Sequence, residues 1–138
     1  MSRLGLSLAL ALLAGTVALT TPAANAAAAR HWFSSPTHNI GCYVDKTVAR
    51  CDVARHTYPS PPKPAGCPAD WGDAVQVTRR ARLTCHGDTT LGATYVLAYG
   101  HRVRFGDKAC ISRRSGMVCK NLRTRHGFRL SAGSYRLW

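Results

Sequence analysis

The stretch "CYVDKTVARC", Cys42–Cys51, holds eight residues between two cysteines, and the same count returns in "CISRRSGMVC", Cys110–Cys119. Folding each stretch about its centre brings its two cysteines opposite one another. The first then turns at Asp45–Val48, and Gly116 can close the second. Opposed Cα atoms in a non-hydrogen-bonded antiparallel pair lie about 4.5 Å apart, within the reach of a disulfide. The spacing therefore predicts two β-hairpins, each closed by a disulfide.

Two further cysteines, Cys67 and Cys85, complete the set of six. Six cysteines allow many pairings, and the count alone does not choose among them. Once the two hairpins are closed, however, Cys67 and Cys85 are left for each other. Zinc is the competing interpretation because the chain also has six histidines. Zinc sites favour closely spaced pairs such as C-x₂-C, which do not occur here, so we expect disulfides, no metal and no cofactor.

The first 26 residues have the pattern of a secretory signal peptide. Arg3 precedes an apolar run, and the small residues Ala24 and Ala26 flank Asn25. A membrane anchor is the alternative, but the run is short for a bilayer of about 30 Å and no charged stop follows it. We expect cleavage after Ala26, leaving residues 27–138 as one secreted, extracellular domain without a transmembrane segment. Thiols oxidise in that compartment, which favours the disulfides.

The rest of the chain has short runs of β-branched, aromatic and leucine residues separated by Gly, Pro, Ser and Asp, with no helical apolar stripe. This pattern predicts an all-β fold, a small disulfide-stapled antiparallel sandwich or barrel. The proline-rich segment Tyr58–Cys67 is expected to lie extended on the surface, as a crossover between two β layers. The expected strands are Ile40–Val44, Val48–Val53, Ala74–Thr78, Arg82–His86, Thr94–Tyr99, Arg104–Ser112, Met117–Leu122 and Phe128–Leu130.

The charge of the chain is strongly positive. It has 19 Lys and Arg against six acidic residues, all of them Asp, for a formal net charge of +13. A small domain this basic attracts anionic polymers. Alternation along strands predicts that some of the arginines share one face of a sheet. The alternative is that the arginines are spread evenly over the solvated surface and form no binding site. The candidate anion-binding residues are Arg79, Arg80, Arg82, Arg102, Arg104, Arg113, Arg114, Arg123, Arg125 and Arg129.

Several blocks carry a family resemblance: "FSSPTHNIGC" (33–42), "PPKPAGCPADWG" (61–72), "CISRRSGMVCKN" (110–121) and "RHGFRLSAGSYRLW" (125–138). In this order they resemble a family of small secreted actinobacterial proteins with a cysteine-rich domain of unknown function. The resemblance implies no established activity. The sequence departs from the family pattern at Thr37-His38, where the pattern has Ser-Gly, and at Arg125, where it has the first glycine of G-H-G-F.

Catalytic candidates are few. His126 lies beside a glycine and can act as an acid or a base near neutral pH, and His86 lies close to Asp88. A structural role, a turn histidine bound to a backbone carbonyl, is the simpler interpretation of His126. The motifs G-x-S-x-G and H-E-x-x-H do not occur. We expect the tryptophans Trp32, Trp71 and Trp138 to anchor the core or a terminus.

These observations favour a secreted, non-catalytic domain that binds an anionic extracellular polymer, either a cell-wall polymer or nucleic acid. One alternative is an inhibitor of an extracellular trypsin-like protease. In that case the rigid Cys110–Cys119 loop would present Arg113 or Arg114. A second alternative is a small secreted nuclease or phosphodiesterase that uses His126 and His86.

Overall fold

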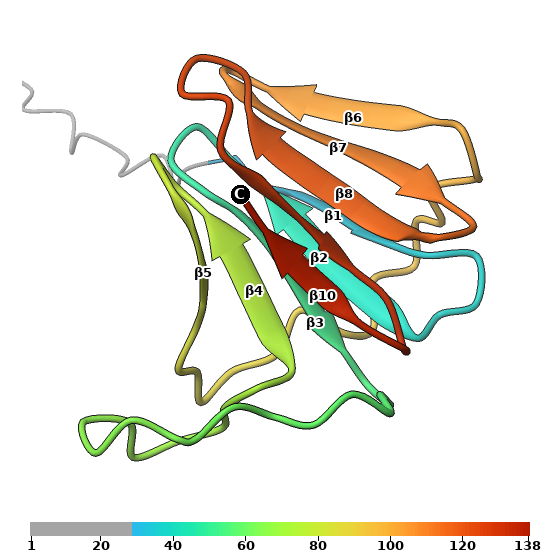
Figure 1. The fold of residues 1–138 in the computed structure, drawn as a ribbon. Coiled ribbons are helices and arrows are strands. Elements are labelled where there is room, and N and C mark those ends of the chain that lie inside the picture. The colour runs from blue at the N-terminus through green and yellow to red at the C-terminus, as the bar shows by residue number, and fades with distance from the viewer. Residues whose placement is uncertain (1–28) are drawn as a thin grey trace, which may run out of the picture.

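The computed structural model describes residues 29–138, and this part of the chain forms two five-stranded antiparallel sheets packed face to face (Figure 1). The arrangement is the sandwich of the two expected architectures, and it is not a closed barrel. The first sheet contains, in spatial order, β1 (His31–Ser34), β2 (Ile40–Val44), β3 (Ala49–Val53), β4 (Ala74–Val77) and β5 (Ala81–Leu83). The second contains β10 (Tyr135–Leu137), β9 (Gly127–Leu130), β8 (Gly116–Asn121), β7 (Lys108–Arg113) and β6 (Arg102–Phe105).

Both cysteine hairpins have the register that their spacing predicts. Cys42 lies opposite Cys51 across β2 and β3, and Cys110 lies opposite Cys119 across β7 and β8. Each pair is joined by a disulfide, and a third joins Cys67 to Cys85, so the pairs are those expected from the sequence. The turn of the first hairpin is fixed by Asp45, whose Oδ1 accepts a hydrogen bond from the backbone N–H of Thr47 at 2.8 Å.

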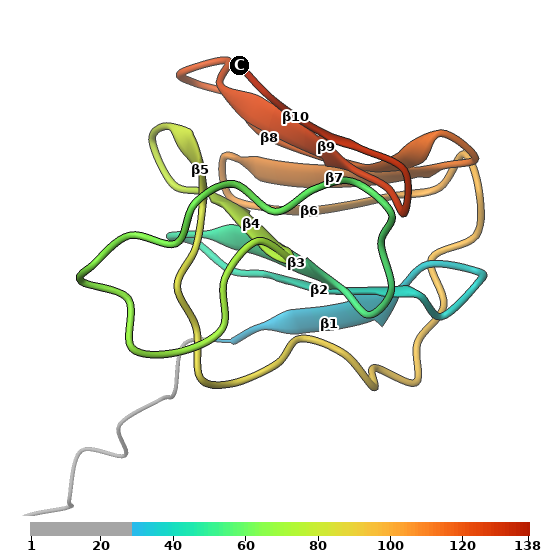
Figure 2. The same ribbon diagram turned by 60° about the horizontal axis from the view of Figure 1, so that its bottom comes forward.

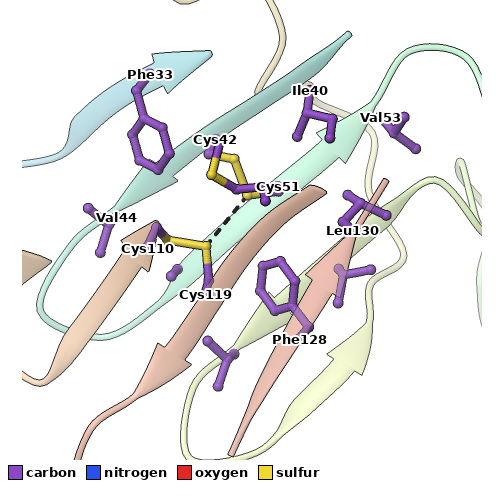
Figure 3. Close-up of a cluster of buried hydrophobic side chains, with 14 of the residues drawn as sticks. Phe33, Ile40, Cys42, Val44, Cys51, Val53, Cys110, Cys119, Phe128 and Leu130 are labelled. Atoms are coloured by element: carbon purple, nitrogen blue, oxygen red, sulfur yellow. Dashed lines mark hydrogen bonds between the residues drawn. A yellow bond between two sulfur atoms is a disulfide. The ribbon is translucent and has the colours of Figure 1, made fainter. Parts of the chain in front are cut away.

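The two hairpin disulfides meet in the middle of the sandwich (Figure 3). The Sγ of Cys51 lies 3.7 Å from the Sγ of Cys119, so sulfur packs against sulfur between the sheets. The aromatic rings of Phe33 and Phe128, both fully buried, belong to the same cluster. Crosslinks within each sheet therefore also form the contact between the sheets.

The expected strand Arg104–Ser112 was wrong, because the structure has two strands there, β6 and β7. They form a hairpin in which Phe105 pairs with Lys108 and the two residues between them, Gly106 and Asp107, make the turn. Gly106 has a φ of 59°, a backbone conformation that glycine adopts without strain. Gly-Asp between two apolar runs is itself a hairpin signal, so the sequence did contain the information.

The expected strand Thr94–Tyr99 was also wrong. This segment forms only an isolated β-bridge, between Val96 and Ser34. Leu97 is its one side chain in the hydrophobic core. β5 begins and ends earlier than expected, and the edge strands β1 and β10 were not predicted. Both are short, and each is held in place by its pairing with a longer neighbour rather than by a strong pattern of its own.

The proline-rich segment does not cross between the layers, contrary to expectation. It joins β3 to β4, which are neighbours in the first sheet. Local bonds hold it at the side of the sandwich: the hydroxyl of Tyr58 donates to the carbonyl of Gly72 at 2.9 Å, and the indole N–H of Trp71 donates to the carbonyl of Pro61 at 3.1 Å. The chain instead passes from the first sheet to the second through residues 84–101.

This crossover makes the two outer faces of the sandwich different (Figure 2). Residues 84–101 run along the outer face of the first sheet, where the hydroxyl of Thr90 donates to the carbonyl of Gly41 at 2.6 Å. A side chain at Gly41 would collide with the backbone of Thr90, so glycine is needed for this close approach. The outer face of the second sheet has no comparable cover from the described chain.

Candidate anion-binding face

Strand alternation decides which side chains point outward from the second sheet. Cys110, Cys119 and Phe128 point into the core, so the residues on either side of them point outward. The strand register places these outward residues in rows across the sheet. One row is Arg102, Ile111, Val118, Arg129 and Arg136, from β6 to β10.

A second row runs beside the first and contains Arg104, Ala109, Lys120 and Gly127. Arg113, at the end of β7, also points outward. Six cations therefore share one face that the rest of the described chain leaves uncovered. We call this set the basic face: Arg102, Arg104, Arg113, Lys120, Arg129 and Arg136. Lys120 and Arg136 were not among the residues predicted from the sequence.

Five of the six carboxylates of the described residues lie on the first sheet and its loops, and only Asp107 lies at the edge of the basic face. Asp107, in the turn between β6 and β7, accepts a hydrogen bond from Lys108 Nζ at 2.6 Å. On the first sheet and its loops, ion pairs join Asp45 to Arg30, Asp73 to His86, and both Asp52 and Asp88 to Arg50. The positive charge of the basic face is therefore not cancelled by neighbouring acids, and the face favours anions.

Two adjoining hollows lie on the basic face and share Val118, Lys120 and Leu122. The first, of about 170 Å³, is also lined by Arg102 and Arg113. The second, of about 390 Å³, is also lined by Asn121, Arg125 and Trp138; we call it the Trp138 hollow. Apolar side chains thus form part of the lining and cations surround them, which suits a polymer with both apolar and anionic parts.

Trp138 anchors the C-terminal end of the described chain, one of the two roles expected for the tryptophans, and does not enter the core. Its side chain is 42% exposed, as is that of Trp32, and Trp71 is half-buried. Its backbone exchanges two hydrogen bonds of 3.0 Å with Gly127 on β9. A Cβ at Gly127 would lie 2.9 Å from Cζ2 of the indole, so the missing side chain leaves room for the ring against the strand.

A third hollow, the turn groove, lies where the two sheets meet. It has a volume of about 520 Å³ and is lined by Thr78, Arg79, Arg80, Arg82, Thr124 and His126. Two hydrogen bonds tie its walls together: Asn121 Nδ2 donates to the carbonyl of Thr78 at 2.8 Å, and Thr124 Oγ1 donates to the carbonyl of Arg79 at 2.7 Å. The structure thus brings His126 together with three of the predicted arginines.

The other predicted arginines have different surroundings. The guanidinium of Arg114 lies 4.9 Å from the centre of the Tyr99 ring, in a cation–π contact. Arg123 Nε lies 3.9 Å from Asp107 Oδ2. Arg125 has a φ of 66°, the left-handed conformation that glycine adopts more easily, in agreement with the departure from the glycine pattern noted in the sequence.

The two candidate catalytic histidines are not brought together. His86 binds Asp73 at the start of β4, whereas His126 shares the turn groove with Thr78 at the end of β4. The five residue steps from Asp73 to Thr78 span about 16 Å in an extended strand. The histidines therefore do not form an acid–base pair acting on a single phosphate.

His86 belongs to an ion cluster on the outer side of the first sheet, in which Arg50, Asp52 and His86 are buried and Asp73 and Asp88 lie at the surface. Arg50 makes two bonds of 2.9 Å to the carboxylate of Asp52 and one of 2.8 Å to that of Asp88. Its hydrogen bond is the main reason that the pKa of Asp88 lies below the usual value. Sequence reasoning paired His86 with Asp88 but missed Arg50, Asp52 and Asp73, although Arg50 and Asp52 follow the two-residue spacing of one strand face.

The ring of His86 has an acceptor at each nitrogen. Nδ1 lies 2.6 Å from the carbonyl oxygen of Asp88, and Nε2 lies 2.9 Å from Oδ1 of Asp73. Both acceptors require a proton on the facing nitrogen, so the cluster favours the imidazolium. Burial opposes this charge, but the hydrogen bonds to Asp73 and Asp88 outweigh it and raise the pKa of His86.

This raised pKa predicts that the protein loses stability as the pH rises. Below the unfolded pKa of about 6.5 the histidine is protonated in both states and the cluster contributes fully. Between the unfolded pKa and the higher folded pKa, the folded state holds a proton that the unfolded state has released, so the contribution falls as the pH rises and is lost once the folded pKa is passed. We expect the Tm to fall as the pH rises above about 6.5. The His86→Gln variant should show a flatter profile; an equally steep one would contradict this role for His86.

Within residues 29–138, no group of three or more His, Cys, Asp or Glu side chains is arranged to hold a metal ion. In the same residues no helix is long and apolar enough to cross a lipid bilayer.

Comparisons with known proteins give one match. The model of a protein family described as "Family of unknown function (DUF6636)" matches residues 11–138. No curated protein and no solved structure matches the chain.

Proposed function

The chain belongs to this family of unknown function, and we propose from its own surface that it binds an anionic polymer without catalysis. The observation that carries the proposal is the basic face. Six cations share the uncovered outer face of the second sheet, whereas the corresponding face of the first sheet is covered by residues 84–101. The turn groove adds three more arginines at the end of the sandwich.

We place this activity outside the cell. The N-terminal segment with the signal-peptide pattern lies outside the described residues, so the support from structure is the three disulfides, which are typical of extracellular proteins. Cell-wall polymers and released nucleic acid are the anionic polymers of that environment. Arginine suits either, because its guanidinium forms paired hydrogen bonds with phosphate or carboxylate oxygens.

Polymer binding is better supported than the two alternatives. A protease inhibitor would present Arg113 or Arg114 from the Cys110–Cys119 loop, but Arg114 lies over the Tyr99 ring, which leaves only Arg113 for that role. A phosphodiesterase that uses His86 and His126 would need these residues close together, but they lie at opposite ends of β4.

The test compares two variants that lose the same charge. Arg102→Ser/Arg113→Ser/Arg136→Ser removes three exposed cations from the basic face, and Lys46→Ser/Arg55→Ser/Lys63→Ser removes three exposed cations from elsewhere. We expect the first to weaken binding to heparin and to DNA by at least about tenfold at 0.15 M salt, and to reduce the slope of log K against log salt by about 2. The second should change both much less.

Equal losses in the two variants would contradict the proposal, since they would mean that only the overall charge matters. Binding of the wild type that disappears at about 0.1 M salt would contradict it for the same reason.

A further inference from the structure

We propose that the Trp138 hollow holds a base of a single-stranded nucleic acid, which identifies the class of polymer bound by the basic face. The inference rests on the proposed function, because the phosphates of the same strand would bind the neighbouring cations. It depends on the exposed indole, the cations beside it and the strained backbone of Arg125.

The indole of Trp138 is suited to stacking. It lies next to Gly127, where no side chain separates the ring from β9, and it is still 42% exposed. A ring supported on one side and open on the other does not have to be ordered when a base binds, so little freedom is lost. Bases stack on such aromatic platforms whatever their identity, because each base has a flat π face.

Cations lie where the phosphates of a stacked nucleotide would be. Lys120 and Arg125 line the same hollow as Trp138, and Lys120 also lines the neighbouring hollow with Arg102 and Arg113. A strand with one base on Trp138 can therefore continue along the basic face. An indole flanked by cations matches the combination of stacking and charge that single-strand binding proteins use.

The polar side chain in the hollow is not free to read a base edge. Asn121 is buried; its amide donates to the carbonyl of Thr78, and its Oδ1 accepts from the backbone N–H groups of Arg123 and Thr124. Recognition in this hollow would then come from stacking and charge, so we expect little preference for base sequence.

The backbone of Arg125 provides an independent observation. Its φ of 66° is unfavourable for a residue with a side chain, and such strain is found at functional sites. Glycine would relieve the strain but would remove a cation from the Trp138 hollow. Single strands fit this site better than duplexes, because a duplex keeps its bases stacked inside and cannot offer one to the indole.

The experiment uses two probes of about 16 nucleotides: oligothymidylate and an abasic strand with the same sugar–phosphate backbone. Fluorescence anisotropy of each labelled strand gives its affinity for the full-length protein. We expect the wild type to bind oligothymidylate at least about tenfold more tightly than the abasic strand. Trp138→Ala should abolish this difference, and Trp138→Phe should keep part of it.

The matched control is Trp32→Ala. This indole is also 42% exposed but lies on the first sheet, 5.0 Å from the Tyr43 ring, so its loss should leave both affinities unchanged. Arg125→Gly should weaken binding of both strands while raising the Tm, a combination that damage to the fold does not produce.

The outcomes separate this inference from the proposed function. If the wild type binds both strands equally, or if Trp138→Ala keeps the preference, the base-stacking site is disproved. A sugar–phosphate polymer without bases, such as a wall polymer, is then the partner, provided that abasic binding still requires the basic face. If the triple variant of the basic face binds the abasic strand as well as the wild type does, the proposed function itself is wrong.

Discussion

Replacing Arg50 with methionine is expected to lower the free energy of unfolding by about 3–5 kcal/mol. Arg50 is buried and satisfies two carboxylates, those of Asp52 and Asp88. Methionine fills much of the same volume but removes both hydrogen bonds that the guanidinium gives to the fully buried Asp52. The carboxylate then keeps only the N–H of Thr90 at 2.8 Å and the more distant ring of His86 at 4.0 Å, and a poorly compensated buried charge is costly. Urea denaturation measures this free energy, and because urea is uncharged it does not screen the ion pairs as a salt would.

The control is Arg55→Met, which removes an exposed arginine just after the same strand. It should change the free energy of unfolding by less than about 0.5 kcal/mol. The double variant Arg50→Met/Asp52→Leu should recover part of the loss, because it removes the stranded carboxylate as well. If Arg50→Met unfolds at the same urea concentration as the wild type, the cluster does not stabilise the fold.

The second large effect is expected on the free energy of unfolding when a disulfide is removed. Comparing two of the disulfides distinguishes the contribution of core packing from that of loop closure. Cys42–Cys51 closes a loop with a sequence separation of 9, and Cys67–Cys85 closes one of 18. Chain entropy alone gives about 2.7 kcal/mol for the shorter loop and about 3.2 kcal/mol for the longer one. The disulfide of the shorter loop, however, lies in the core, where the sulfur of Cys51 packs against that of Cys119. Removing this disulfide therefore also leaves a cavity.

We therefore expect Cys42→Ala/Cys51→Ala to cost about 4 kcal/mol and Cys67→Ala/Cys85→Ala about 3 kcal/mol, the reverse of the order that loop length predicts. Urea denaturation of the two double variants decides the order. A larger loss from the 67–85 pair would show that the contact between the hairpin disulfides adds little.

The sequence predicted the centre of the fold better than its edges. The cysteine spacing determined the register of both hairpins, because residues at equal distances from a turn must lie opposite one another. The edge strands β1 and β10 gave no comparable signal, since their stability comes from pairing with β2 and β9. The segment Thr94–Tyr99 has the composition of a strand, but its neighbours in space leave it only one bridge.

The candidate site was predicted only in part. Alternation indicated that some arginines share a face, but which ones depends on the order of the strands. Arg102 and Arg136 are separated by three intervening strands, and only the register from β6 to β10 places them in one row. The Trp138 hollow depends in the same way on Gly127 lying beside the last strand.

Glycine was expected from the resemblance at positions 38 and 125, and the backbone agrees with that expectation. His38 and Arg125 are the two non-glycine residues with positive φ in the described chain, at 55° and 66°. The backbone thus keeps the conformation that glycine favours while carrying a larger side chain. At Arg125 that side chain lines the Trp138 hollow, so the strain coincides with the site.

The most direct test of polymer binding by the basic face is amine labelling of the lysines with and without saturating single-stranded DNA, read by mass spectrometry. Lys120 is exposed on the basic face, Lys46 and Lys63 are exposed elsewhere, and Lys108 is buried. We expect DNA to slow the labelling of Lys120 at least about fivefold and to leave Lys46 and Lys63 unchanged. Equal protection of the three exposed lysines, or protection of Lys46 and Lys63 alone, would contradict the account.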